Sequence, residues 1–118
     1  MVVIIDDNGP EILRLIAKHL AEEGIESVQF VTAEKGRDSF ENADLVIVNL
    51  GLAERGNAIR VIEYAREGGY RFPIAVTSGT FPFEADRLQG EARRLGVAAC
   101  IAKPFPPDFV ERIKALLR

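Results

Sequence analysis

Residues 43–52 read ADLVIVNLGL, and this stretch decides the fold that the rest of the chain must follow. Its apolar run, 45–48, ends abruptly at Asn49. A short continuous apolar run bounded by polar residues is typical of a strand that is buried on both faces of a parallel sheet. The stretch therefore predicts a buried strand over 44–48, with an amide side chain at its carboxyl end.

The same kind of pattern continues on both sides of this strand. Similar short runs predict further strands at 2–5, 26–31, 73–77 and 98–102. Helical spacing of apolar residues predicts helices at 8–24, 57–69 and 106–118. We also expect a short helix at 33–40, which Gly36 weakens, and a mostly polar helix at 83–96. Apolar strands that alternate with amphipathic helices imply a parallel sheet covered on both faces, with right-handed crossovers. We expect an α/β fold of one domain over 1–118, a three-layer, doubly wound sandwich around a five-stranded parallel sheet.

The first and last predicted helices carry the clearest apolar stripes. In the helix at 8–24, Asn8 and Glu11 resemble a capping box. The expected buried stripe of this helix is Ile12, Leu13, Ile16, Ala17 and Leu20. In the helix at 106–118 it is Phe109, Val110, Ile113, Leu116 and Leu117.

Composition excludes several classes of function. The chain has 118 residues and is 47% hydrophobic, enough for a sizeable core. Its net charge of −3 argues against nucleic-acid binding, which needs a basic surface. No segment has the roughly 20 apolar residues that span a bilayer, and the apolar run at 2–5 is too short for a signal peptide. The single cysteine, Cys100, excludes an intrachain disulfide framework, so we expect a cytoplasmic protein that binds no membrane.

Polar side chains follow four of the predicted strands, at the edge where doubly wound sheets bind ligands. Carboxylate and carbonyl oxygens suit Mg²⁺, and a hydroxyl and a lysine can hold the oxygens of a phosphoryl group. The sequence therefore predicts a site for a divalent cation and a tetrahedral anion at this edge. The residues at the strand ends are Asp6, Asp7, Asn49, Thr77, Ser78 and Lys103.

With these motifs in place, the chain resembles the receiver domain of two-component response regulators over essentially all of its length. The resemblance rests on VVIIDDNGPEI, TAEKGRDSF, ADLVIVN, FPIAVTSG and LGVAACIAKPF. It implies a flavodoxin-like sheet with the strand order 2-1-3-4-5. It also implies a module of phosphorelay signalling rather than an enzyme.

The resemblance also implies a role for each residue of the site. Asp6 and Asp7 match the acidic pair that binds Mg²⁺, to which Gly51 would offer its backbone carbonyl. Ser78 matches the hydroxyl that contacts the phosphoryl group; it is preferred to Thr77 because it lies five residues after Pro73. Lys103 matches the lysine that bonds the acceptor and the phosphoryl oxygens.

The phosphoacceptor aspartate of the family falls on Asn49. Phosphoryl transfer to this position needs a carboxylate oxygen as the nucleophile, and a carboxamide is a poor one. We therefore expect no phosphorylation at Asn49 and a weakened or absent Mg²⁺ site. The asparagine is either native, which makes the chain a pseudo-receiver, or an introduced change in an ordinary receiver.

Two further departures bear on this alternative. Ala53 stands where the family usually carries a proline, and Cys100 stands at the position of the aromatic switch residue. A cysteine cannot swing as an aromatic ring does. These departures favour a native pseudo-receiver, whereas the retention of the acidic pair and Lys103 favours an intact site.

The resemblance implies a histidine kinase or another signalling protein as the partner. It also allows a homodimer through the fourth helix, the fifth strand and the fifth helix. The residues that such a face would use are Arg87, Glu91, Arg94, Phe109 and Arg112. The kinase, the pathway and any output domain cannot be read from the sequence.

The enzymes that share this architecture need other residues after the first strand. A haloacid-dehalogenase-type phosphatase needs a D-x-D pattern, and a flavodoxin needs a hydroxyl-rich phosphate loop. A dinucleotide-binding fold needs G-x-G-x-x-G. The chain instead has IIDDNGP at this point, which argues against all three. The two readings that stay open are a phosphorelay receiver and a phosphorylation-independent interaction module.

Overall fold

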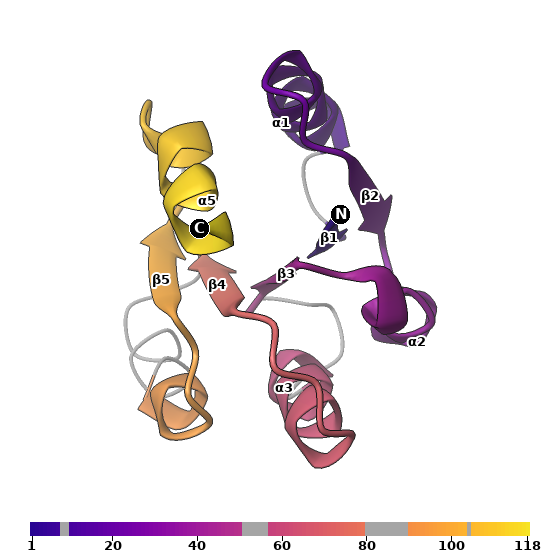
Figure 1. The fold of residues 1–118 in the computed structure, drawn as a ribbon. Helices are drawn as coiled ribbons and strands as arrows, with labels where there is room; N and C mark the ends of the chain where they lie inside the picture. Colours follow the sequence, from indigo (N-terminus) through magenta and orange to yellow (C-terminus); the bar gives the residue numbers. More distant parts are fainter. Residues whose placement is uncertain (8–9, 51–56, 80–89, 104) are drawn as a thin grey trace.

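The computed structural model describes residues 1–7, 10–50, 57–79, 90–103 and 105–118 (Figure 1). The five strands form one parallel sheet in the order β2-β1-β3-β4-β5. This order confirms the predicted doubly wound, flavodoxin-like topology. The strands are β1 (Val2–Ile5), β2 (Ser27–Phe30), β3 (Leu45–Asn49), β4 (Ile74–Ser78) and β5 (Ala99–Ala102).

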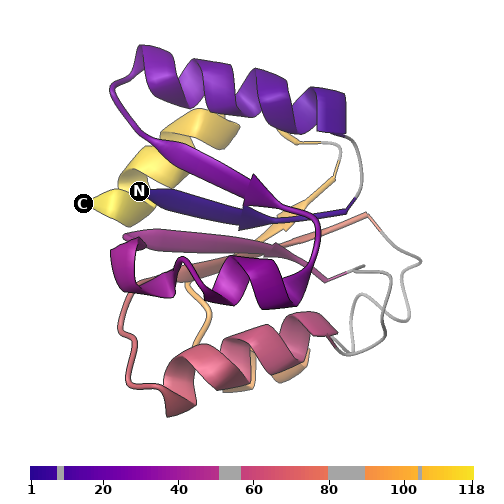
Figure 2. The ribbon, with the colours of Figure 1, turned by 90° about the vertical axis from the view of Figure 1, so that its right-hand side faces the viewer.

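Helices cover both faces of the sheet, as the alternating pattern predicts. Figures 1 and 2 show α1 (Pro10–Glu22) and α5 (Phe109–Leu117) on one face. The other face carries α2 (Ala33–Arg37), α3 (Asn57–Glu67) and a helical segment at 90–94. No helix in the described part of the chain combines the length and the apolar character that crossing a membrane requires.

The helix boundaries differ from the prediction at several ends. The helix expected at 33–40 stops at Arg37, and a short 3₁₀ turn, Phe40–Asn42, follows it. Gly36 lies so close to β1 that a Cβ there would collide with the side chain of Ile5, so the glycine that weakens this helix also lets it approach the sheet. The last helix begins only at Phe109, whose N–H donates to the carbonyl of Pro106 across a turn. Asn8 and the first half of the helix expected at 83–96, residues 83–89, lie outside the described residues.

Strand side chains alternate between two apolar cores. Val2 and Ile4 of β1, together with Leu45 and Ile47 of β3, pack against α1 and α5. The residues between them belong to the second core, on the side of α3. The alternation explains why each strand is apolar throughout.

Two residues of the expected stripe on α1 are not fully buried, since Ala17 is half-buried and Ile12 is exposed. Leu13, Ile16 and Leu20 face the sheet, but Ile12 is 53% exposed. Successive helical residues are about 100° apart around the axis. Since Leu13 points at the sheet, its neighbour Ile12 is turned away, and the prediction for Ile12 was wrong.

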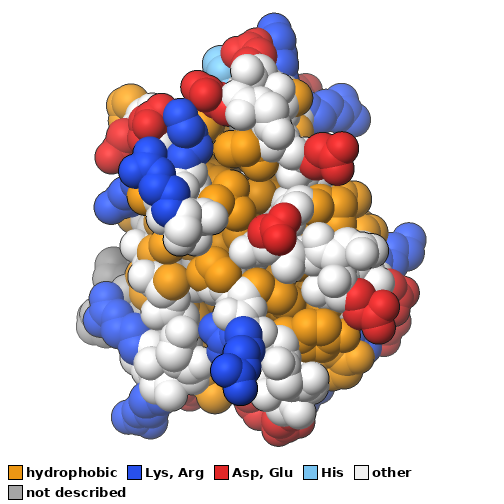
Figure 3. All heavy atoms as spheres, viewed as in Figure 1, with side chains coloured by type: hydrophobic (Ala, Val, Ile, Leu, Met, Phe, Trp, Pro, Cys, Tyr) orange, Lys and Arg blue, Asp and Glu red, His pale blue; other side chains and the backbone are white. Residues whose placement is uncertain are grey.

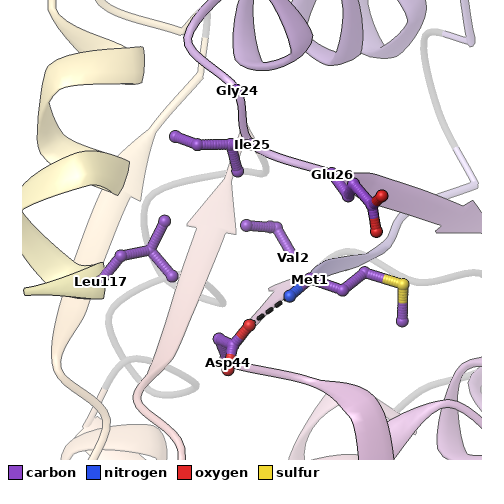
Figure 4. A pocket seen from close by; sticks show the side chains of 7 residues that line it. All are labelled: Met1, Val2, Gly24, Ile25, Glu26, Asp44 and Leu117. Atoms are coloured by element: carbon purple, nitrogen blue, oxygen red, sulfur yellow. Dashed lines mark hydrogen bonds and ion pairs between the residues drawn. The ribbon is translucent and has the colours of Figure 1, made fainter.

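The amino ends of the strands lie on a face where apolar side chains alternate with polar and charged ones. Figure 3 shows this face, with hydrophobic side chains gathered along its middle. A hollow of about 380 Å³ opens here, and the N-terminal amine forms an ion pair with Asp44 beside it (Figure 4). The hollow is lined by Met1, Val2, Gly24, Ile25, Glu26, Asp44 and Leu117.

Candidate functional site

Strand register brings the predicted site residues together at the carboxyl ends of the strands. Ile5 lies beside Val48 in the ladder, so the next residues, Asp6 and Asn49, end neighbouring strands. Asn49 in turn lies beside Thr77 of β4. Residues far apart in the sequence therefore meet at the edge that lies opposite the amino ends in Figure 2.

The carboxylate of Asp6 is the centre of this group. Its side chain is only 2% exposed. Asn49 Nδ2 donates a hydrogen bond to Asp6 Oδ1 over 3.1 Å. Lys103 Nζ donates to Asp6 Oδ2 over 2.7 Å and forms an ion pair with it. Each carboxylate oxygen thus accepts a hydrogen bond from a nitrogen donor, and the one from Lys103 is of the strong, charge-assisted kind.

The direction of the Asn49 amide follows from its neighbour. An ionised carboxylate only accepts hydrogen bonds, so it can pair with the amide nitrogen but not with the amide oxygen. Asn49 is 2% exposed and cannot turn to bulk water instead. The side chain of Asn49 therefore acts as a hydrogen-bond donor to Asp6.

Several contacts fix the position of Lys103. Its backbone N–H donates to the carbonyl of Ser78 over 2.8 Å, which continues the pairing of β4 and β5 beyond the strands. A Cβ on Gly79 would lie 3.1 Å from the Cβ of Lys103, so the lysine stem passes close to bare backbone. Its ammonium lies 5.6 Å from the ring centroid of Phe105. The lysine is held along its whole length and only 20% of its side chain is exposed.

The two hydroxyls at the end of β4 differ in their surroundings. Ser78 is 7% exposed and pairs in register with Ala102. Thr77 is 1% exposed, and its Oγ1 has no hydrogen-bond partner among the residues that the structure describes. Alternation along β4 places Thr77, rather than Ser78, on the face that its register partner Asn49 shares. The sequence placed both hydroxyls at this edge and preferred Ser78 for its spacing from Pro73, and that preference stays a prediction.

The donors around Asp6 and Asn49 do not suit a divalent cation, and the other expected carboxylate ligand, Asp7, is half-buried next to Asp6 in the sequence. Mg²⁺ takes oxygen ligands, including carboxylates with free lone pairs. Both oxygens of Asp6 face N–H donors, and Asn49 turns its nitrogen to the centre of the group. Across the described ranges, no three side chains of the His, Cys, Asp and Glu types lie together; Mg²⁺ itself uses only one or two protein carboxylates. Gly51, the expected backbone ligand, lies outside the described residues, as does Ala53.

The surface expected for dimerisation or docking needs one correction. Phe109 is 4% exposed, and its ring centroid lies 4.5 Å from that of Phe105. It is a core residue of α5, so the prediction that it serves an interface was wrong. Arg94 is exposed, Arg112 lies near Asp108, and Arg87 falls outside the described residues.

Comparisons with known proteins match this chain by structure alone. No model of a known protein family matches it, and no curated protein does. A CheY-like receiver domain from Methanospirillum hungatei JF-1 superposes with a TM-score of 0.83 and 25% identity, covering 98% of this chain and 91% of its own.

Two further solved structures agree with this match. HP1043, an orphan response regulator of H. pylori, has a TM-score of 0.79 and 25% identity, covering 100% of this chain and 97% of its own. The receiver domain of NtrX from Brucella abortus has a TM-score of 0.81 and 20% identity, covering 99% and 97%. The structural neighbours of this chain are thus response regulator receiver domains, which are signalling modules.

Proposed function

We propose that the chain is a receiver module of two-component signalling that accepts no phosphoryl group at position 49. The observation that carries the proposal is the hydrogen bond from Asn49 to Asp6, with Lys103 on the other oxygen of the same carboxylate. Position 49 thus lies beside an acidic residue and a lysine, the types that the receiver family uses. The structural neighbours, which are response regulators, support the receiver part of this proposal.

The proposed site lacks the carboxylate nucleophile that phosphoryl transfer needs at position 49. A carboxylate at position 49 would offer an oxygen to attack phosphorus. The ammonium of Lys103 is placed to stabilise charge on a transferred phosphoryl group, and Ser78 is the hydroxyl that we propose to contact it. The amide of Asn49 donates a hydrogen bond to Asp6 instead. It carries no negative charge, and its nitrogen is engaged in this hydrogen bond and cannot act as a nucleophile.

The partner that we propose is a histidine kinase or another signalling protein, in the cytoplasm. One observation favours the alternative of a pseudo-receiver read without phosphorylation: both oxygens of Asp6 are already engaged, which holds the site in one arrangement. H. pylori HP1043, a structural neighbour, is itself an orphan response regulator. In either case the module acts by binding other proteins and catalyses no turnover of its own.

The test is the intact mass of the protein after incubation with acetyl phosphate and Mg²⁺. The native chain is compared with Asn49→Asp and with Asn49→Asp combined with Lys103→Met. We expect a gain of one phosphoryl group in Asn49→Asp only. A gain in the native chain would contradict the proposal. No gain in any variant would show that Asp6, Ser78 and Lys103 form no competent site, and would leave the interaction module as the function.

A further inference from the structure

A buried carboxylate needs a compensating charge close by, because burial removes its hydration. In this chain the compensation for Asp6 is internal. Lys103 supplies the positive charge at 2.7 Å, and Asn49 supplies a second N–H donor at 3.1 Å. The pair of Asp6 and Lys103 is neutral in sum, and Asn49 adds no charge to it.

We propose that Lys103 and Asn49 together take the place of a divalent cation, so that the folded chain neither needs nor responds to Mg²⁺. This inference deepens the proposed function, since it concerns the same centre and makes it independent of the metal. It explains why an amide suits position 49 in this chain. An asparagine has nearly the shape of an aspartate, yet it can donate a hydrogen bond to the neighbouring carboxylate.

An aspartate at position 49 would disturb this balance of charges. Its oxygen would take the place of the donor nitrogen that lies 3.1 Å from Asp6 Oδ1. Two carboxylates at that separation repel each other unless a cation lies between them. One lysine would then face two buried charges, and a divalent cation would become the natural counter-charge.

Entry of a cation into the native arrangement meets resistance from the groups already there. The cation would have to displace the nitrogen of Asn49 or the ammonium of Lys103 from Asp6. The stem of Lys103 lies against Gly79 and its ammonium lies near Phe105, and withdrawal of the side chain would give up these contacts. Displacement would also leave Lys103, whose side chain is only 20% exposed, without its carboxylate partner.

Thermal unfolding of three purified proteins in EDTA and in millimolar Mg²⁺ tests the proposal. The proteins are the native chain, Asn49→Asp, and the matched control Asn42→Asp, which makes the same change at an exposed position of the 3₁₀ turn. We expect the midpoints of the native chain and the control to be unchanged by Mg²⁺. Asn49→Asp should melt lower than the native chain in EDTA and rise by about 5 °C or more with Mg²⁺.

Two outcomes would overturn the inference: a rise in the native chain as large as that in Asn49→Asp, or no rise in either. Should Asn49→Asp fail to fold, amide NMR spectra of the native chain decide the matter. Unchanged signals of Asp6 and Asn49 on Mg²⁺ addition support the proposal, and shifted signals overturn it. An Asn49→Asp protein that gains a phosphoryl group without any stabilisation by Mg²⁺ refutes this inference alone, whereas one that is stabilised but never phosphorylated refutes the proposed function alone.

Discussion

The ion pairs at the two ends of the same five strands differ in how deeply they are buried. At the carboxyl ends, Asp6 is buried and pairs with Lys103. At the amino ends, the ion pair joins the terminal amine to Asp44, whose side chain is 69% exposed. Both ends hold an ion pair, but only one of the two carboxylates lies out of reach of water.

This difference in burial helps to distinguish residues that stabilise the fold from residues that serve its function. An exposed ion pair contributes little to the free energy of unfolding, because water already solvates both charges. A buried one is costly to assemble, and similar apolar residues would often serve stability as well or better. Polar residues kept at such a place are therefore better explained by function than by folding. The following substitutions sharpen that contrast, from the largest expected effect to the smallest.

Lys103→Met should cause the largest loss of stability. It leaves the buried carboxylate of Asp6 without its counter-charge, which costs about 3 kcal/mol or more in the free energy of unfolding. Urea denaturation measures the loss. The matched control is Lys114→Met on α5, since Lys114 lies 3.3 Å from Glu23 in a more exposed ion pair and should cost less than about 1 kcal/mol. Equal losses of stability in the two variants would show that burial does not distinguish the contributions of the two ion pairs.

Arg66→Met tests the polar anchor nearest the amino end of β4. The guanidinium donates to the carbonyls of Tyr70 and Phe72 over 3.1 and 3.0 Å, and to that of Gly96 over 3.5 Å. Losing these hydrogen bonds should cost about 2 kcal/mol, because each has a charged donor. Arg71→Met, at an exposed position nearby, should change the free energy of unfolding by less than about 0.5 kcal/mol. A similar loss in both variants would mean that the positive charge, and not the contacts with the carbonyls, determines the stability.

Thr77→Val should leave stability unchanged or raise it by up to about 1 kcal/mol. The substitution removes a buried hydroxyl that has no partner within the described part of the chain, and it preserves the shape of the side chain. Thermal and urea unfolding both measure the effect. A loss of more than about 1 kcal/mol would show that Oγ1 makes a hydrogen bond in solution and belongs to the polar centre.

Asp44→Asn should have the smallest effect. It weakens the exposed ion pair with the terminal amine, and the free energy of unfolding should change by less than about 0.5 kcal/mol. Raising the salt concentration should reduce even this difference, since exposed pairs are screened. A loss approaching that of Lys103→Met would show that exposure does not separate the two ion pairs.

Much of the fold could be predicted because its signals are local. The continuous apolar runs gave the strands to within a residue or two, and the helical stripes gave the layers. The errors arose where tertiary contacts decide. Ile12 fits the stripe but turns away from the sheet, and the helix expected at 33–40 ends early, just after Gly36 packs on Ile5.

That Asp6, Asn49 and Lys103 lie together could be predicted, but the hydrogen bonds between them could not. Strand ends and the family resemblance selected Asp6, Asn49 and Lys103. Which atom of Asn49 faces Asp6, and that Lys103 bonds the same carboxylate, depends on the register of strands that lie far apart in the sequence. No spacing along the chain encodes that choice.

The most direct measurement is a double-mutant cycle on Asp6 and Lys103. The free energy of unfolding is measured for the native chain, Asp6→Asn, Lys103→Met and the double variant. A buried pair in mutual contact predicts a coupling free energy of about 2 kcal/mol or more. A coupling below about 0.5 kcal/mol, the value expected of an exposed pair such as the one at Asp44, would contradict the account of a centre neutralised from within.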